Sequence, residues 1–421
     1  MRLLHFTASV LLLALNTSVL ASEVWQVLGD MRAGWVQYDY NNPPPGDPNI
    51  HQGNVDSKGF YVVPKLSVIT PTLEGFYAKV TGAVATDFGL NDPEYESRTF
   101  VLGRNGKSYA ILQEAHVAYD KNGHRVLIGA EESDTPMINT DEGYMLANTF
   151  QVATYTNTAF EHMIFSAGYF HKMAGVFDNG IDGTHYQSMA KASFVSFKDR
   201  LNAKDRGIVY GTFQYDDTTH NFQFWNYYAT DLYNTLFVQY DLTQNAGSFS
   251  YDIGLQFINF KAVGALSDND HSRIDYSLYS ARFDGTFENG FTFDTGAAKY
   301  TDGEGQSSTL GAWGGYPYFV NGMIFHFFEA GSLQNAASYK AQAGYNVNDA
   351  YWLGVRYTHW DLDPLYSKTL TGESQDFMKT YGFHLSYNSK SGGYFTGTYE
   401  YLDLDNEPKT FGLRLIGGYR F

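Results

Sequence analysis

The sequence predicts an all-β protein: a transmembrane antiparallel β-barrel of eighteen strands, with short periplasmic turns and long extracellular loops. Three observations predict it: hydrophobicity alternates with a period of two along the chain, short and long connections alternate, and aromatic residues are abundant. Aromatic residues make up 17% of the 421 residues and charged residues another 17%. A soluble enzyme typically has fewer aromatic residues, and about a quarter of its residues are charged.

Charge and cysteine content exclude several classes of function. The chain has 28 Lys and Arg residues against 45 Asp and Glu residues, a formal net charge of −17. Proteins that follow nucleic-acid phosphates need an excess of bases, so nucleic-acid binding is not expected. The absence of cysteine excludes a disulfide scaffold and a thiolate metal site. Neither a zinc-protease motif nor a serine-hydrolase elbow occurs, so we expect no enzyme activity, no metal site and no cofactor.

The first 21 residues have the features of a secretory signal peptide. Arg2 is followed by the apolar run 10–15 and then by Val19-Leu20-Ala21, which forms an acceptable cleavage site before Ser22. We therefore expect a signal peptide over residues 1–21 and a single barrel domain over residues 22–421.

The predicted strands are runs in which apolar and polar residues alternate. In the last run, Phe411, Leu413 and Leu415 alternate with Gly412 and Arg414, so apolar side chains share one face of the strand. About ten residues per strand, tilted by about 40°, rise roughly 26 Å, which matches the apolar band of a membrane barrel. The runs lie at 29–40, 60–69, 75–86, 108–119, 124–132, 150–157, 161–171, 207–216, 220–228, 234–242, 248–260, 274–285, 291–300, 337–346, 350–360, 379–388, 393–402 and 409–421.

The connections between these runs alternate in length. Short ones carry turn residues, as in Lys121-Asn122-Gly123 and Glu288-Asn289-Gly290. Longer ones lie between them, such as 172–206 and 301–336, with 229–233 and 403–408 as short exceptions. Short turns at one rim and long loops at the other are typical of outer-membrane barrels.

Several stretches resemble the OprD-like outer-membrane porins. The best match runs from Gly129 through Pro136 to Phe150 and continues from Ser166 to Tyr169. In that family, this region is a strand, an inward-folding constriction loop and the strands that follow. The stretch 309–321 resembles the second constriction loop of the family.

The end of the chain adds to this resemblance. Tyr419 and the terminal Phe421 are similar to the signal that the barrel-assembly machinery reads. The resemblance implies an eighteen-stranded barrel with its own lumen and an arginine-rich ladder of bases along the pore. Glu132 and Tyr144 stand where the family's first constriction segment carries such bases. Selectivity for anionic substrates is therefore not implied for this chain.

Charges of opposite sign gather in different parts of the predicted pore. Lys and Arg are absent from 126–171 and from 301–336. The residues expected at the acidic constriction are Glu131, Glu132, Asp134, Asp141, Glu142, Tyr144, Asp302, Glu304 and Glu329. The bases expected on one arc of the lumen are Lys65, Lys79, Lys340, Arg356, Arg414 and Arg420. Acids opposite bases would set up a transverse field across the constriction, and the excess of acid favours cations.

The sequence thus predicts a porin in the outer membrane of a Gram-negative bacterium. It would let small hydrophilic solutes and ions diffuse passively, with amino acids or small carboxylates as candidate selected solutes and with a preference for cations. Expected partners are outer-membrane lipid and lipopolysaccharide, the barrel-assembly machinery and the solutes themselves, and the protein would be a monomer or a homotrimer. Two alternatives stay open: a channel for hydrophobic substrates, and a structural or adhesive barrel that conducts no ions.

Overall fold

The structure is a computed structural model. It describes residues 24–42, 55–96, 99, 101–102, 106–141, 145–175, 185–192, 204, 206–268, 275–303, 311–326, 333–367 and 372–421. The predicted signal peptide lies outside these residues. Among the residues described, no helix is long and apolar enough to cross a membrane.

The described part of the chain forms one antiparallel sheet of 19 strands. The strands are β1 (Gln26–Asp39), β2 (Ser57–Ile69), β3 (Phe76–Ala85), β4 (Tyr109–Lys121), β5 (His124–Glu131), β6 (Thr149–Asn157), β7 (Met163–Ala174), β8 (Gln187–Ser188), β9 (Ile208–Asp216), β10 (His220–Ala229), β11 (Tyr233–Ala246), β12 (Phe249–Ala262), β13 (Asp275–Phe287), β14 (Phe291–Tyr300), β15 (Ala337–Asn346), β16 (Tyr351–Asp361), β17 (Phe377–Asn388), β18 (Gly393–Leu404) and β19 (Thr410–Arg420). Short helices occur at α1 (Pro93–Glu96), α2 (Met189–Ala192) and η2 (Gly264–Leu266).

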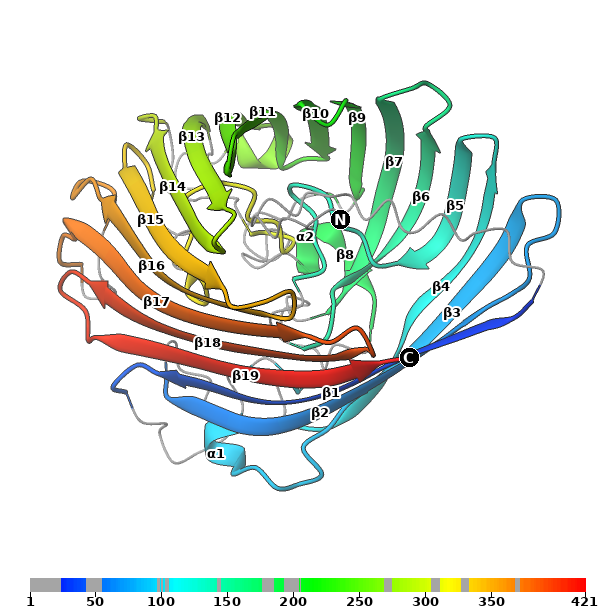
Figure 1. Ribbon diagram of the computed structural model, residues 1–421, viewed down its shortest axis with the longest axis horizontal. Helices are drawn as coiled ribbons and strands as arrows, with labels where there is room; N and C mark the ends of the chain where they lie inside the picture. Colours follow the sequence, from blue (N-terminus) through cyan, green and yellow to red (C-terminus); the bar gives the residue numbers. More distant parts are fainter. Residues whose placement is uncertain are drawn as a thin grey trace.

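Eighteen of these strands close into a ring (Figure 1). Each strand of the ring pairs with the strand that precedes it and the one that follows it in the chain, and β1 closes the ring by pairing with β19. The two-residue strand β8 pairs only with the end of β7, whereas β7 continues the wall by pairing with β9. Figure 1 shows β8 and α2 inside the ring. Closure leaves no sheet edge, so the backbone groups of the wall are paired within the protein, as a lipid environment requires.

The turn chemistry predicted for one rim is present. Asn122 and Gly123 have φ values of 56° and 78°, the left-handed pair that a two-residue hairpin requires. Gly290 and Gly392 have positive φ values in the turns after β13 and β17. The strand ends that the long connections join lie at the opposite rim, together with the two short exceptions after β10 and β18.

Burial in the wall is inverted relative to a soluble protein. Large apolar side chains are exposed on the outer face, such as Ile128 at 64% and Leu255 and Val355 at 55%. Polar side chains on the inner face are buried, such as Gln239 and Gln256. An apolar exterior around a polar interior suits a wall with lipid outside and water inside.

Aromatic side chains form rows across neighbouring strands on the outer face. Tyr357 of β16 faces Tyr381 of β17, with ring centroids 5.2 Å apart, and Tyr381 lies 6.1 Å from Tyr401 of β18. Near the short-turn rim, the rings of Tyr351 and Tyr387 are 4.6 Å apart. Such rows match the interfacial girdles of membrane barrels.

The sequence prediction of the fold is confirmed. Each of the eighteen predicted runs corresponds to a wall strand, with ends that agree within about four residues. The sequence prediction did not include β8 and the short helices, which lie in the connections.

Candidate functional site

Two connections run through the interior of the barrel and narrow it. We call residues 132–141 and 145–148, between β5 and β6, the first inward segment, and residues 311–326, between β14 and β15, the second inward segment. They meet where the amide of Asn139 donates to the carbonyl oxygen of Trp313, at 3.0 Å. Ile138 bridges to both Trp313 and Gly314. The segments matched to constriction loops in the sequence therefore lie against each other.

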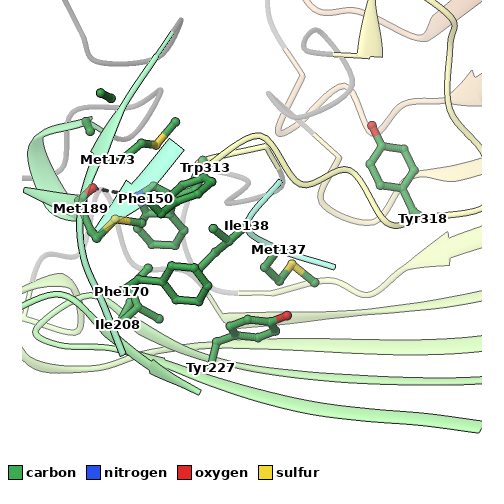
Figure 2. Packing of buried hydrophobic residues seen from close by; sticks show 14 of the residues in the cluster. Met137, Ile138, Phe150, Phe170, Met173, Met189, Ile208, Tyr227, Trp313 and Tyr318 are labelled. Carbon is green, nitrogen blue, oxygen red and sulfur yellow. Dashed lines mark hydrogen bonds between the residues drawn. The ribbon is translucent and has the colours of Figure 1, made fainter. Parts of the chain in front are cut away.

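An apolar cluster joins these segments to the wall (Figure 2). The Trp313 indole N–H donates to the carbonyl oxygen of Met189 in α2, at 2.7 Å, and its ring stacks on Tyr233 of β11 at 5.5 Å. Figure 2 shows Ile138 between Trp313 and Phe170. This cluster therefore fixes both inward segments against one part of the wall.

The predicted acids of the first segment are held by nearby groups. Glu132 forms an ion pair with Lys65 of β2 at 2.5 Å, and Glu131 lies 3.6 Å from Arg125. Asp134 accepts hydrogen bonds from the amide and the hydroxyl of Thr140. Glu132 and Asp134 therefore stabilise the segment on which they lie, whereas Glu131 pairs within β5, and the role of these acids in ion selectivity stays a prediction.

The other predicted constriction residues fall in three groups. Asp141 lies in the first inward segment, where its Oδ2 is buried. Asp302 is exposed and accepts a hydrogen bond from the Tyr366 hydroxyl in the connection after β16, at 2.6 Å, so it joins two outer loops. The remaining predicted constriction residues, which lie outside the described residues, are Glu142, Tyr144, Glu304 and Glu329.

Most of the predicted bases have carboxylate partners. Lys79 pairs with Glu114 of the neighbouring strand β4 at 2.7 Å, and Lys340 pairs with Asp294 of β14 at 2.6 Å. Arg420 lies at the end of β19, is largely exposed, and approaches Asp30 at 3.6 Å. The partner carboxylates therefore reduce the positive electrostatic field of these bases.

Two predicted bases contact uncharged groups. Arg414 donates to the hydroxyl of Tyr38, at 2.8 Å from Nη2. Arg356 donates from Nε to the Gln342 side chain at 2.8 Å, and from Nη1 to the backbone carbonyl of Asn321 at 3.2 Å. The second contact connects the wall to the second inward segment.

A second group of charged wall residues was missed. Arg282 of β13 lies 2.8 Å from both Asp241 of β11 and Asp284 of its own strand, and its guanidinium sits over the Phe319 ring at 4.8 Å. All three charged side chains face inward and are buried. Their signal was present in the sequence, because each is a charged residue at an inward position of an alternating run.

The residues of the predicted assembly signal lie at the seam of the barrel. Tyr419 and Phe421 are both exposed on the outside. The Phe421 backbone exchanges two hydrogen bonds with Gly29, at 2.8 and 3.0 Å, and its ring occupies the space that a Cβ on Gly29 would need. Recognition by an assembly machinery stays a prediction.

Two loop residues have strongly shifted pKa values. Burial raises the pKa of Asp141 to about 7, although the charge of Arg414 opposes the shift. Burial, assisted by the charges of Arg414 and Arg356, lowers the pKa of His326 to about 3. Asp141 is therefore partly protonated near neutral pH, and His326 is neutral there.

No metal-binding cluster is evident in the described ranges, where no three His, Asp or Glu side chains are grouped to hold a metal ion. The chemistry of the interior is that of ion pairs, amides and hydroxyls along a wall.

Comparison with known proteins bears on the fold. No protein-family model and no curated protein matches the sequence. Among solved structures, the outer membrane protein opdK from Pseudomonas aeruginosa matches 95% of this chain and 99% of its own, with a TM-score of 0.74 at 15% identity. A BenF-like porin from Pseudomonas fluorescens gives the same coverage and TM-score at 16% identity. OccAB3 from Acinetobacter baumannii matches 94% of this chain and 99% of its own, with a TM-score of 0.74 at 14% identity. The chain therefore has the fold of these outer-membrane β-barrels.

Proposed function

We propose that this chain is an outer-membrane channel through which small hydrophilic solutes and ions diffuse passively. One observation carries the proposal: a closed barrel with an apolar outer face has a polar, charged inner face that two inward segments narrow. Lipid satisfies the outer face, and water satisfies the inner one.

The narrowing supports selection among small polar solutes. Passage beside Lys65, Lys79 and their partner carboxylates exposes a solute to closely spaced charges of both signs. Such a surface replaces part of the hydration shell of polar and zwitterionic solutes. It offers no comparable interaction to apolar solutes, so their passage is not favoured. Amino acids and small carboxylates are the candidate solutes.

We further propose a mild preference for cations. Four inward bases, Lys65, Lys79, Arg282 and Lys340, are each within 2.8 Å of a carboxylate, so their fields are largely cancelled. Other inward carboxylates bind neutral donors, with no base within ion-pair distance among the described residues; examples are Asp134, Asp252 and Glu400. Arg356, an inward base that binds neutral groups, offsets part of this excess.

Export, assembly and surroundings follow from the same proposal. A cleaved leader over 1–21 would deliver the chain to the periplasm, and the C-terminal Tyr419 and Phe421 would direct its insertion. Lipopolysaccharide and outer-membrane lipid would surround the apolar belt. The protein would be a monomer or a homotrimer.

The proposal is tested by ion conductance in planar bilayers and by osmotic swelling of liposomes. Protein folded into planar bilayers should produce discrete conductance steps, with a reversal potential of the sign expected for cations in a salt gradient. Liposomes that contain it should swell in amino acids and small carboxylates, and not in large sugars. Folded protein that gives no steps and no swelling would favour a structural or adhesive barrel, and uptake restricted to apolar solutes would favour a hydrophobic-substrate channel.

A further inference from the structure

One cross-strand row on the inner wall carries part of the second inward segment. The row runs over five neighbouring strands from β16 through β19 to β1, and consecutive members are register partners. We call it the seat row; its members are Arg356, Gly382, Glu400, Gly412 and Tyr38. The part of the segment that lies on it is 321–325, whose residues contact members of the row on all five strands.

The basic end of the row binds carbonyl groups. Arg356 Nη1 donates to the backbone oxygens of Asn321 and Gly322, at 3.2 and 3.3 Å. Its Nε is held by Gln342 of β15, which fixes the plane of the guanidinium. A guanidinium with a fixed plane presents its donors in a fixed direction.

The acidic centre of the row binds amides. Glu400 is fully buried and accepts hydrogen bonds from three consecutive backbone N–H groups. Oε1 accepts from Met323 at 2.8 Å, and Oε2 accepts from Ile324 at 2.5 Å and Phe325 at 2.8 Å. Three donors aimed at one carboxylate stabilise its charge in a site without bulk water.

The two glycines leave room for the segment to reach Glu400. A Cβ on Gly382 would lie 2.6 Å from the Met323 sulfur, and one on Gly412 would lie 2.8 Å from Cγ2 of Ile324. Both glycines flank Glu400 in register, so the side chains of the segment occupy the places on either side of its carboxylate. At the end of the row, the Phe325 ring lies 6.3 Å from that of Tyr38.

We propose that Glu400 is a positioning residue that fixes the second inward segment on the seat row and thereby sets the cross-section of the pore. The statement that Glu400 sets the cross-section of the pore rests on the channel function proposed above. The row is complementary to the backbone of the segment, because Arg356 donates hydrogen bonds to its carbonyl groups and Glu400 accepts hydrogen bonds from its N–H groups. A side chain that cannot accept three N–H groups would leave buried donors unpaired, and the segment would leave the wall.

The experiment compares Glu400→Gln with the wild-type protein. Glutamine has the same size but accepts through one oxygen, and its NH₂ group would face an amide donor. Glu288→Gln, in an exposed turn at the opposite rim, is the matched control. Retention of the heat-modifiable band in gels establishes for each variant that the barrel has folded.

Two readouts are taken on the same preparations. Amide hydrogen exchange at 323–325 should become roughly 10- to 100-fold faster in Glu400→Gln and stay unchanged in Glu288→Gln. Single channels of Glu400→Gln should show excess current noise and altered conductance, which a purely structural role in the wall would not produce.

Each result decides a separate statement. Unchanged exchange in Glu400→Gln would overturn the assignment of Glu400 as the anchor. Faster exchange with unchanged conductance and noise would overturn its role in setting the pore. A wild-type protein that conducts no ions would overturn the channel function, while the exchange data would still decide whether Glu400 holds the segment.

Discussion

Two stretches of the inner wall use their charges in different ways. On β2 to β5, charged side chains pair with one another, as Lys79 does with Glu114. On β16 to β18, Arg356 and Glu400 contact the backbone of the second inward segment instead. The first stretch presents paired charges to the lumen, and the second holds a loop in place. A charge on the inner wall is therefore not by itself a determinant of ion selectivity.

The largest effect is expected at Glu114, in the paired stretch. Glu114→Gln removes the partner of Lys79 at a buried position and leaves an uncompensated positive charge. Breaking a fully buried pair typically destabilises by about 3–5 kcal/mol, and because the Lys79 side chain is 25% exposed, the loss here should lie below that range. The unpaired base should shift the reversal potential toward anions. Denaturant unfolding in detergent and reversal potentials in bilayers measure the two effects.

The double variant Glu114→Gln with Lys79→Met is its control. Since both charges are then absent, stability and selectivity should return toward the wild-type values. A double variant that is as unstable as the single one would show that Glu114 matters for something other than this pair.

A smaller effect is expected at Arg356, in the loop-holding stretch. Arg356→Gln removes charged hydrogen bonds to Asn321 and Gly322, each worth about 1.5–3 kcal/mol at most, but leaves no buried charge unpaired. Current noise should increase, and the reversal potential should move toward cations because a base is lost. A shift toward anions would contradict the assignment.

Asp141 should give a milder, pH-dependent effect. Its pKa is raised to about 7, so raising the pH from 6 to 8 ionises it and should strengthen the cation preference. The ordinary pKa of Asp in an unfolded chain is about 3.9. The folded state therefore binds more protons between that pH and 7, and the stability contribution of this group falls as the pH rises through that window. Asp141→Asn should remove this part of the pH dependence, measured as reversal potentials from pH 5 to 9.

The smallest effect is expected at the Lys121–Glu74 pair near the short-turn rim. Its two charges are 2.8 Å apart but largely exposed to solvent. Lys121→Gln should leave conductance, selectivity and stability unchanged within error, because exposed ion pairs contribute little. A clear change in conductance would show that charges at this rim also control the pore.

The sequence predicts the wall better than the interior. Alternation in runs such as 409–421 defines strands and their faces, because an inward position differs from an outward one in the residues it tolerates. The turns at Asn122-Gly123 and Glu288-Asn289-Gly290 mark hairpins through local chemistry alone. Both signals need only neighbouring residues.

The interior depends on contacts between distant residues, which no period encodes. Nothing in 311–326 indicates that Met323 meets Glu400, 77 residues away. The partners of Lys65 and Lys340 were also not predicted, because pairing depends on register and on the path of the loops. The sequence did contain one usable signal, at Glu400. It is a single acid at an inward position between Tyr399 and Tyr401, and because a buried charge needs a partner, this position predicts a contact with another group.

The most direct test of the account is labelling of adjacent cysteines on β17 in liposomes, in a chain that has no cysteine of its own. Phe383 faces outward and His384 faces inward. The account predicts that His384→Cys reacts with a small, membrane-impermeant thiol reagent, whereas Phe383→Cys is protected from it and reacts with a lipid-soluble one. Equal reaction of both positions with the impermeant reagent, or the reverse pattern, would contradict a wall with lipid outside and water inside.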